Sequence, residues 1–198
     1  MDIKVYEEQV HRIKLGKNPL TESAFQELII EHLVNDNGYK RRNASSYDSV
    51  RAMDTELFFD FLDRTQPDQM ERLHALYNGG SRATILAKIR NAIAGRGLVD
   101  CIWHGVQFDA GIELNLVYPR PSADFDRKAT ALFDENVLSV MEEVYHKEGE
   151  RIDLVIFLNG LAIFTIELKC ESSGTGWDYR NAIRQYKFER DCKTPLLM

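Results

Sequence analysis

Residues 151–170 read RIDLVIFLNGLAIFTIELKC, and this stretch decides the fold. Two runs rich in Ile, Leu, Val and Phe flank an Asn-Gly pair, which predicts a β-hairpin apolar enough to lie in the centre of a sheet. The hairpin nevertheless carries Asp153 on its first arm and Glu167 and Lys169 on its second. Because a buried carboxylate without a partner is costly, we expect a cation beside Asp153 and Glu167.

The register of the hairpin decides whether these charged residues meet. With a two-residue turn at the Asn-Gly pair, Asp153 would lie opposite Ile166, and the alternation of the strand would place Glu167 on the other face. Such a turn would rule out a shared site. A three-residue loop with Gly160 in the left-handed conformation, or a bulge in one arm, would shift the pairing by one residue. We predict this second geometry, which brings all three charged side chains onto one face.

Two carboxylates that converge at a strand end, with a lysine two residues along, are the parts of a Mg²⁺ site beside a polarising ammonium. Phosphodiester hydrolysis uses these parts, because the carboxylates hold the metal and the metal activates water. In the alternative interpretation Asp153 pairs with Arg151 or caps the strand, while Glu167 and Lys169 are solvated at an edge. The pattern D…ExK is degenerate by itself. Its placement across one apolar hairpin favours the catalytic interpretation.

The remaining sequence predicts one α/β domain over residues 1–198. Thr21 is the expected N-cap of the first helix. A Pro turn before the final apolar residues indicates a fragment of a longer chain. The predicted helices are 21–36, about three within 52–95, 122–136 and 178–191; the predicted strands are two within 97–119, 151–158 and 161–169, with 137–146 ambiguous between helix and strand.

Composition narrows the functional classes. The formal net charge of −6 argues against a chain that holds nucleic acid by bulk attraction alone, so any contact must be local or supplied by a partner. The sequence has no signal peptide or membrane-spanning run, which predicts a soluble, cytoplasmic protein. Its three cysteines have no CxxC spacing and are interpreted as free thiols. The histidines lack ligand spacing, and His104 is interpreted as a strand residue.

The charged hairpin resembles the PD-(D/E)xK nuclease core. The longer string resembles the N-terminal nuclease domain of the type I restriction enzyme R subunit (HsdR), through TESAFQELIIEHL, RIDLVIFLNGLAIFTIELKC, and RNAIRQYKFERD followed by TPLL. The resemblance implies a restriction-endonuclease-like core, with a mixed central β-sheet flanked by helices. It also implies a type I site-specific deoxyribonuclease that hydrolyses duplex DNA with Mg²⁺, or with Mn²⁺ in its place.

The same resemblance assigns roles within the hairpin. Asp153 and Glu167 would be metal ligands, the backbone carbonyl of Leu168 would add another oxygen, and Lys169 would be the catalytic lysine. Nucleases of this class often bring a helix glutamate to the metal, and Glu22 is the candidate here. A helical wheel places Glu22 on the apolar side of the first helix, so it is expected to point inward. In the alternative, Glu22 only complements the helix dipole.

The last helix supplies further candidates. The HsdR family has a Gln-xxx-Tyr motif linked to nuclease function, and Gln185 matches its glutamine. Glu189 stands where the motif has tyrosine. The nearest tyrosine is Tyr186, which is expected to contact DNA, with core packing as the alternative role. The helix also has a basic face suited to phosphate contact or, alternatively, to simple solvation. Its residues are Arg180, Arg184, Lys187, Arg190 and Lys193.

The resemblance also implies partners outside this chain. The full subunit would continue into ATP-dependent translocase domains and assemble with methylation and specificity subunits. This chain has no GxxxxGK[ST] motif, so ATP would bind only in those other domains. The isolated fragment is expected to cut DNA weakly or not at all. The alternatives are a catalytically silent docking domain of the same fold and a free-standing repair or resolvase-type nuclease.

Overall fold

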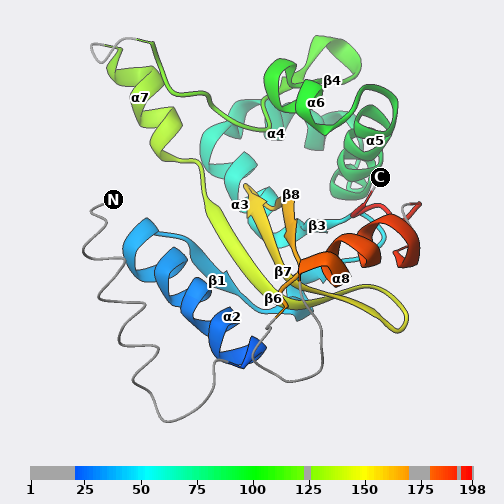
Figure 1. The fold of residues 1–198 in the computed structure, drawn as a ribbon. Helices are drawn as coiled ribbons and strands as arrows, with labels where there is room; N and C mark the ends of the chain where they lie inside the picture. The colour runs from blue at the N-terminus through cyan, green and yellow to red at the C-terminus, as the bar shows by residue number, and fades with distance from the viewer. Residues whose placement is uncertain (1–20, 123–125, 170–178, 191–192, 198) are drawn as a thin grey trace.

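The computed structural model describes residues 21–122, 126–169, 179–190 and 193–197. At its centre is a six-stranded mixed sheet in the order β1-β6-β7-β8-β3-β2, in which β1 and β6 are parallel and the other neighbours antiparallel (Figure 1). The strands are β1 (Lys40–Arg42), β2 (Tyr47–Asp48), β3 (Met53–Asp54), β6 (Leu138–Lys147), β7 (Glu150–Leu158) and β8 (Leu161–Ile166).

The sheet curls, so that its edge strand β2 approaches β7. The rings of Tyr47 on β2 and Phe157 on β7 pack edge to face with their centroids 6.1 Å apart, although β8 and β3 lie between the two strands in the sheet order. A separate two-stranded hairpin is formed by β4 (Val106–Gln107) and β5 (Glu113–Leu114).

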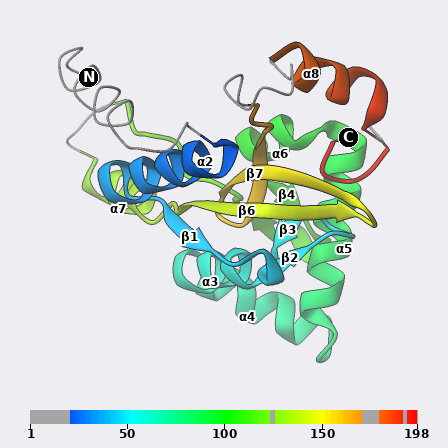
Figure 2. The same cartoon turned by 60° about the horizontal axis from the view of Figure 1, so that its bottom comes forward.

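Helices flank the sheet. Figure 2 shows α2 on one side of β6 and β7, and α3 and α4 on the other. The predicted mixed α/β architecture is therefore confirmed. The described α-helices are α2 (Glu22–Glu31), α3 (Thr55–Thr65), α4 (Pro67–Leu76), α5 (Ser81–Arg96), α6 (Leu98–His104), α7 (Arg127–Asp134) and α8 (Tyr179–Arg184); α2 and α8 continue into the π-helical turns His32–Asp36 and η5 (Gln185–Glu189).

Local sequence signals explain where most helices begin and end. Thr21 caps α2 by accepting a hydrogen bond from the backbone N–H of Ala24 at 3.2 Å, as predicted. Asp54 caps α3, and Pro67 occupies the first turn of α4, where its missing N–H costs nothing. Helix α5 ends at Gly97, which has a positive φ of 85°. The predicted three helices between residues 52 and 95 are thus confirmed, apart from the short strand β3.

The two strands predicted within 97–119 are present as β4 and β5, but the start of this segment is not part of a strand. Residues 98–104 form helix α6, and His104 ends this helix 3.0 Å from Asp100 instead of lying on a strand. Gly97 and Gly105 bracket the helix with positive φ, and Cys101 is fully buried as a free thiol. Burial on one face outweighed the β propensity of Val, Ile and Trp. The other two cysteines lie outside the described residues, and the ambiguous 137–146 segment forms strand β6.

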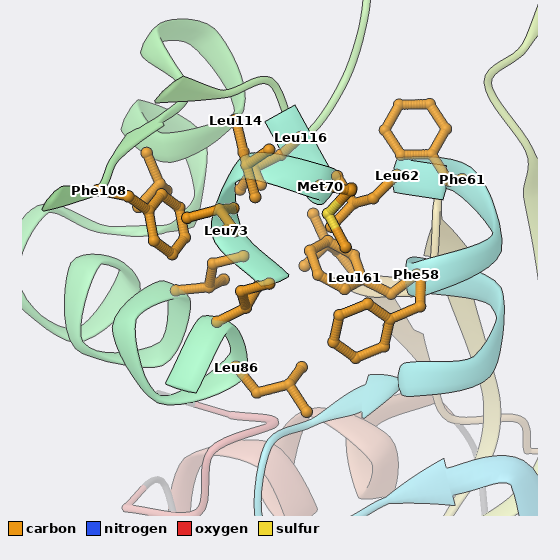
Figure 3. Packing of buried hydrophobic residues seen from close by; sticks show 14 of the residues in the cluster. Phe58, Phe61, Leu62, Met70, Leu73, Leu86, Phe108, Leu114, Leu116 and Leu161 are labelled. Carbon is orange, nitrogen blue, oxygen red and sulfur yellow. The ribbon is translucent and has the colours of Figure 1, made fainter. Parts of the chain in front are cut away.

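The main hydrophobic core lies among α3, α4, α5, α6 and the segment from β4 to residue 116. Figure 3 shows Phe58, Phe61 and Leu62 of α3 packed with Leu161, the first residue of β8. A smaller cluster lies between the sheet and α2, where Ile30 contacts Leu154 and Leu168. The hairpin β7–β8 is therefore packed at both ends, by α3 at its turn and by α2 at its open end. In the described part of the chain, no helix is long and apolar enough to cross a membrane.

Candidate active site

The turn of the β7–β8 hairpin holds two residues. Asn159 and Gly160 have φ values of 50° and 82°, and Leu158 pairs directly with Leu161. Positive φ at both central positions defines the turn that matches the twist of a two-stranded ribbon. Asn159 is fully buried, and its side-chain amide accepts a hydrogen bond from Val137 N–H at 2.7 Å. This hydrogen bond fixes the turn to the segment that leads into β6.

A bulge follows this turn in β8. Phe157 pairs with Ala162, but Ile156 pairs with Phe164, which leaves Ile163 as the extra residue. The predicted bulge in one arm is confirmed. The expectation that a two-residue turn rules out a shared site was wrong, because the bulge restores the shift of one residue that a longer loop would have given.

The shifted register brings the two acidic residues together. Leu154 pairs with Ile166, so the next step of the ladder sets Glu167 beside Asp153. The backbone N–H of Leu168 donates to Asp153 Oδ2 at 2.7 Å. Since the Leu168 side chain is buried against Ile30 and Leu154, strand alternation directs Glu167 and its second neighbour, residue 169, to the other side.

Asp153 lies in the interior of the chain, with 5% of its surface exposed. Burial raises the pKa of Asp153 above its usual value. The hydrogen bond from Leu168 opposes this shift, the negative charges of Glu167 and Glu22 add to it, and the positive charge of Lys169 opposes it. Loss of solvation therefore disfavours the charged form of Asp153 more than the nearby hydrogen bond and positive charge favour it.

Asp153→Asn is expected to stabilise the metal-free chain at neutral pH. Because the folded-state pKa of Asp153 is raised, its contribution to stability is complete below the unfolded pKa of about 3.9 and is lost as pH rises through the folded value. The amide of the variant keeps the acceptor for Leu168 N–H without the buried charge. We expect a melting temperature about 2–4 °C higher at pH 7 in EDTA.

Thermal unfolding at several pH values checks this expectation. The difference between the Asp153→Asn variant and the unchanged chain should shrink as the pH falls toward 4, where the aspartate takes up a proton. An advantage that stayed constant with pH, or a less stable variant at pH 7, would contradict the raised pKa.

The Glu167 carboxylate is bound by two cations. Its side chain is 4% exposed, with Oε1 3.1 Å from Lys169 Nζ and Oε2 2.8 Å from Arg190 Nη2. The side chains of Lys169 and Arg190 are themselves 10% and 9% exposed. Lys169 Nζ also donates to the Leu168 carbonyl at 2.8 Å. The lysine is therefore positioned by two acceptors at the strand end.

The donors available for a metal are hard oxygens. The described residues contain no group of three or more His, Cys, Asp and Glu side chains close enough to hold a metal ion. A site here would thus comprise the carboxylates of Asp153 and Glu167 with the carbonyl of Leu168. One or two carboxylates with several waters is the arrangement that Mg²⁺ prefers, so the donor set fits this ion.

Glu22 lies at the rim of the site. Its side chain is 44% exposed, and its Oε1 lies 4.0 Å from Lys169 Nζ. Figure 2 shows the end of β8 near the first turn of α2. The buried residues of α2 are Gln26 and Ile30, so Glu22 begins the stripe that faces the sheet. It contacts the predicted catalytic lysine, and its role as a metal ligand stays a prediction.

The last helix covers the site with polar side chains. Gln185 Oε1, the Tyr186 hydroxyl and Arg190 Nε are buried, and neither Gln185 Oε1 nor Arg190 Nε has a hydrogen-bond partner among the described residues. Burial raises the pKa of Tyr186. Tyr186 is therefore a partly buried residue with a buried hydroxyl. Its predicted role in DNA binding and the predicted role of Gln185 in catalysis stay predictions.

The predicted basic face divides in two. Arg180, Arg184 and Lys187 are exposed on α8 and η5, and Arg184 pairs with Glu189 at 3.2 Å. Arg190 instead turns inward to Glu167, so it does not share that exposed face. The ion pair joins residues 23 positions apart, and no sequence spacing indicates such a contact. Lys193 lies beyond η5 in a separate described segment.

The protein is a mixed α/β domain whose central hairpin brings two buried carboxylates and a lysine to one strand end. The chain belongs to the family described as type I restriction enzyme R protein N terminus (HSDR_N), whose match covers residues 19–197. The resemblance found in the hairpin and the last helix is confirmed. No curated protein and no solved structure matches the chain.

Proposed function

We propose that this chain is the DNA endonuclease domain of a type I restriction R subunit, with Mg²⁺ as cofactor. The observation that carries the proposal is the bulged hairpin, which brings Asp153, Glu167 and Lys169 together at the end of β8. Asp153 and Glu167 would hold the metal with the Leu168 carbonyl. Lys169 would assist hydrolysis of a phosphodiester.

The burial of these charges supports a catalytic role. A buried ion pair or carboxylate seldom stabilises a fold as well as apolar residues of similar volume. The pairing of Glu167 with two cations offsets its own burial, but Asp153 is left with a raised pKa. A carboxylate with a perturbed pKa, beside a second acid and a lysine at one strand end, is typical of active sites. A silent docking domain would have no use for this arrangement.

The residues of the chain would divide the work. A bound Mg²⁺ would supply an activated water and stabilise the charge that develops on the phosphate. The Lys169 ammonium, held by Glu167 and Leu168, is positioned to donate to a phosphate oxygen. Arg180, Arg184 and Lys187 offer exposed positive charge to the DNA backbone.

The proposal extends to partners that supply the DNA affinity. With a net charge of −6, the domain has little general attraction for duplex DNA. We propose that methylation and specificity subunits, and ATP-dependent motor domains of the full R subunit, bring the DNA to this site. Cutting by the isolated chain is accordingly expected to be weak.

Calorimetric titration with Mn²⁺ or Mg²⁺ tests the metal site directly. Asp153→Ala and Glu167→Ala are each expected to weaken metal binding at least about tenfold, because each removes one of two carboxylate ligands. Glu148→Ala is the control, since Glu148 is an exposed acid at the β6–β7 turn. Circular dichroism must show that all variants are folded.

The titration also separates the alternatives. Loss of binding in both hairpin variants, but not in Glu148→Ala, would place Asp153 and Glu167 at one metal ion. Equal binding by all four proteins, or no binding by any, would favour the docking domain and make the hairpin charges structural.

A further inference from the structure

Arg190 is bound to the same carboxylate that would hold the metal. Its Nη2 lies 2.8 Å from Glu167 Oε2, and both side chains are at least nine-tenths buried. Arg190 follows the π-helical turn η5, where its backbone N–H donates to the Gln185 carbonyl at 2.8 Å. The guanidinium thus reaches Glu167 from a separate element that covers the strand end.

The contact with Glu167 uses only one nitrogen of the Arg190 guanidinium. An arginine that serves a structural ion pair commonly donates two parallel hydrogen bonds to its carboxylate. Here one nitrogen of Arg190 bonds to one oxygen of Glu167, and the buried Nε has no hydrogen-bond partner among the described residues. Arg190 therefore gives Glu167 a nearby positive charge and one hydrogen bond, and not the two parallel hydrogen bonds of a bidentate ion pair.

Both oxygens of Glu167 are already occupied by cations. Oε1 bonds to Lys169, which is also held by the Leu168 carbonyl, and Oε2 bonds to Arg190. A divalent ion that binds Glu167 must share or displace one of these cations. Among the described residues Lys169 contacts three acceptors at this site, whereas the Arg190 side chain contacts Glu167 alone. Arg190 also directly follows η5 instead of lying on the hairpin, so it is the cation that can leave.

We propose that Arg190 is a positioning residue that takes the place of the metal ion on Glu167. In the metal-free chain it neutralises and orients the Glu167 carboxylate, and it withdraws when a divalent cation binds. The turn η5 then acts as a latch whose position reports the state of the site. This inference rests on the proposed function, because it requires Glu167 to be a metal ligand.

This role predicts that removing Arg190 lowers the stability of the metal-free chain but raises its affinity for metal. Removing Arg190 leaves Glu167 with less positive charge, so the metal-free chain should melt at a lower temperature. Removing the same charge also ends the competition for Oε2 and the repulsion of the incoming ion. Metal binding should therefore become tighter, and a purely structural arginine would not produce this gain.

Calorimetric titration of Arg190→Gln with Mn²⁺ tests the inference. We expect binding about three- to tenfold tighter than in the unchanged chain, a size consistent with removing one nearby charge in a partly hydrated site. Arg127→Gln is the control with the same change of charge, because Arg127 is exposed on α7, which Figures 1 and 2 show far from α8. Its affinity should stay within about twofold.

A second pair of variants shows whether the gain acts through Glu167. Glu167→Ala should weaken Mn²⁺ binding at least about tenfold whether or not Arg190→Gln is present, so that Arg190→Gln adds no gain in affinity to it. Unchanged or weaker binding by Arg190→Gln, while the unchanged chain binds Mn²⁺, would overturn the latch and leave the proposed function intact. Absence of binding by the unchanged chain would overturn the proposed function, and the latch with it.

Hydrogen–deuterium exchange on the unchanged chain gives the same test if Arg190→Gln does not fold. Saturation with Mg²⁺ should speed exchange in residues 185–190, because Arg190 releases its hold on Glu167. Exchange that slows or stays constant in this segment while Mg²⁺ binds would overturn the inference.

Discussion

Gly160→Ala is expected to lower the free energy of unfolding by about 4 kcal/mol, one of the two largest effects anticipated for this domain. Gly160 has a φ of 82°, and a Cβ there would lie 2.3 Å from the Asp54 carbonyl oxygen and 2.8 Å from the Phe58 backbone nitrogen. Both neighbours are backbone atoms at the start of α3, so neither can rotate away. Chemical denaturation followed by circular dichroism measures the loss.

Gly149→Ala is the matched control for this substitution. Gly149 lies in the turn between β6 and β7 with a similar φ of 76°, but a Cβ there would meet no atom within 4 Å. It should lose only about 1 kcal/mol, the cost of a left-handed alanine. Equal losses in the two variants would show that the close approach of the hairpin turn to α3 contributes nothing.

Gly160 also affects the candidate site through the register of the hairpin. The backbone N–H of Asp54 donates to the Gly160 carbonyl at 2.8 Å, which ties the turn to β3. The pairing of β7 with β8 starts at that turn, and the bulge at Ile163 shifts this pairing so that Glu167 lies beside Asp153. A displaced turn is therefore expected to weaken metal binding as well as stability.

Lys169→Met is expected to reduce DNA cleavage by the complete restriction complex about 100- to 1,000-fold, the second large effect. The variant keeps the length of the side chain but removes the ammonium that Glu167 and Leu168 position at the strand end. Cleavage of plasmid DNA by the R subunit with its partner subunits measures the loss.

Two comparisons separate chemistry from folding in this experiment. Lys169→Met should still bind Mn²⁺, because the carboxylates of Asp153 and Glu167 remain. Lys128→Met changes an exposed lysine on α7 and should cut DNA at the unchanged rate. Full cleavage by Lys169→Met would exclude a catalytic role for the lysine, and loss of Mn²⁺ binding would assign it to the structure of the site.

Local patterns in the sequence predicted much of the architecture. The Thr21 cap marked the start of α2, and helical patterns within 52–95 predicted α3, α4 and α5, because these signals act within a few residues along the chain. The segment 98–104 was misassigned because its apolar and aromatic residues suit either a strand or a buried helix. Its state depends on burial of Cys101 in the core, which local propensity does not include.

The sequence by itself determined which chemical groups the central hairpin carries and that an Asn-Gly turn closes it, since residue type and turn chemistry are local properties. Tertiary structure alone decided that Ile163 is the bulged residue and that Arg190 turns from the predicted basic face onto Glu167. Strand periodicity is the same on either side of a bulge, so it does not locate the extra residue. An ion pair across 23 residues depends on where the last helix packs, which no spacing in the chain records.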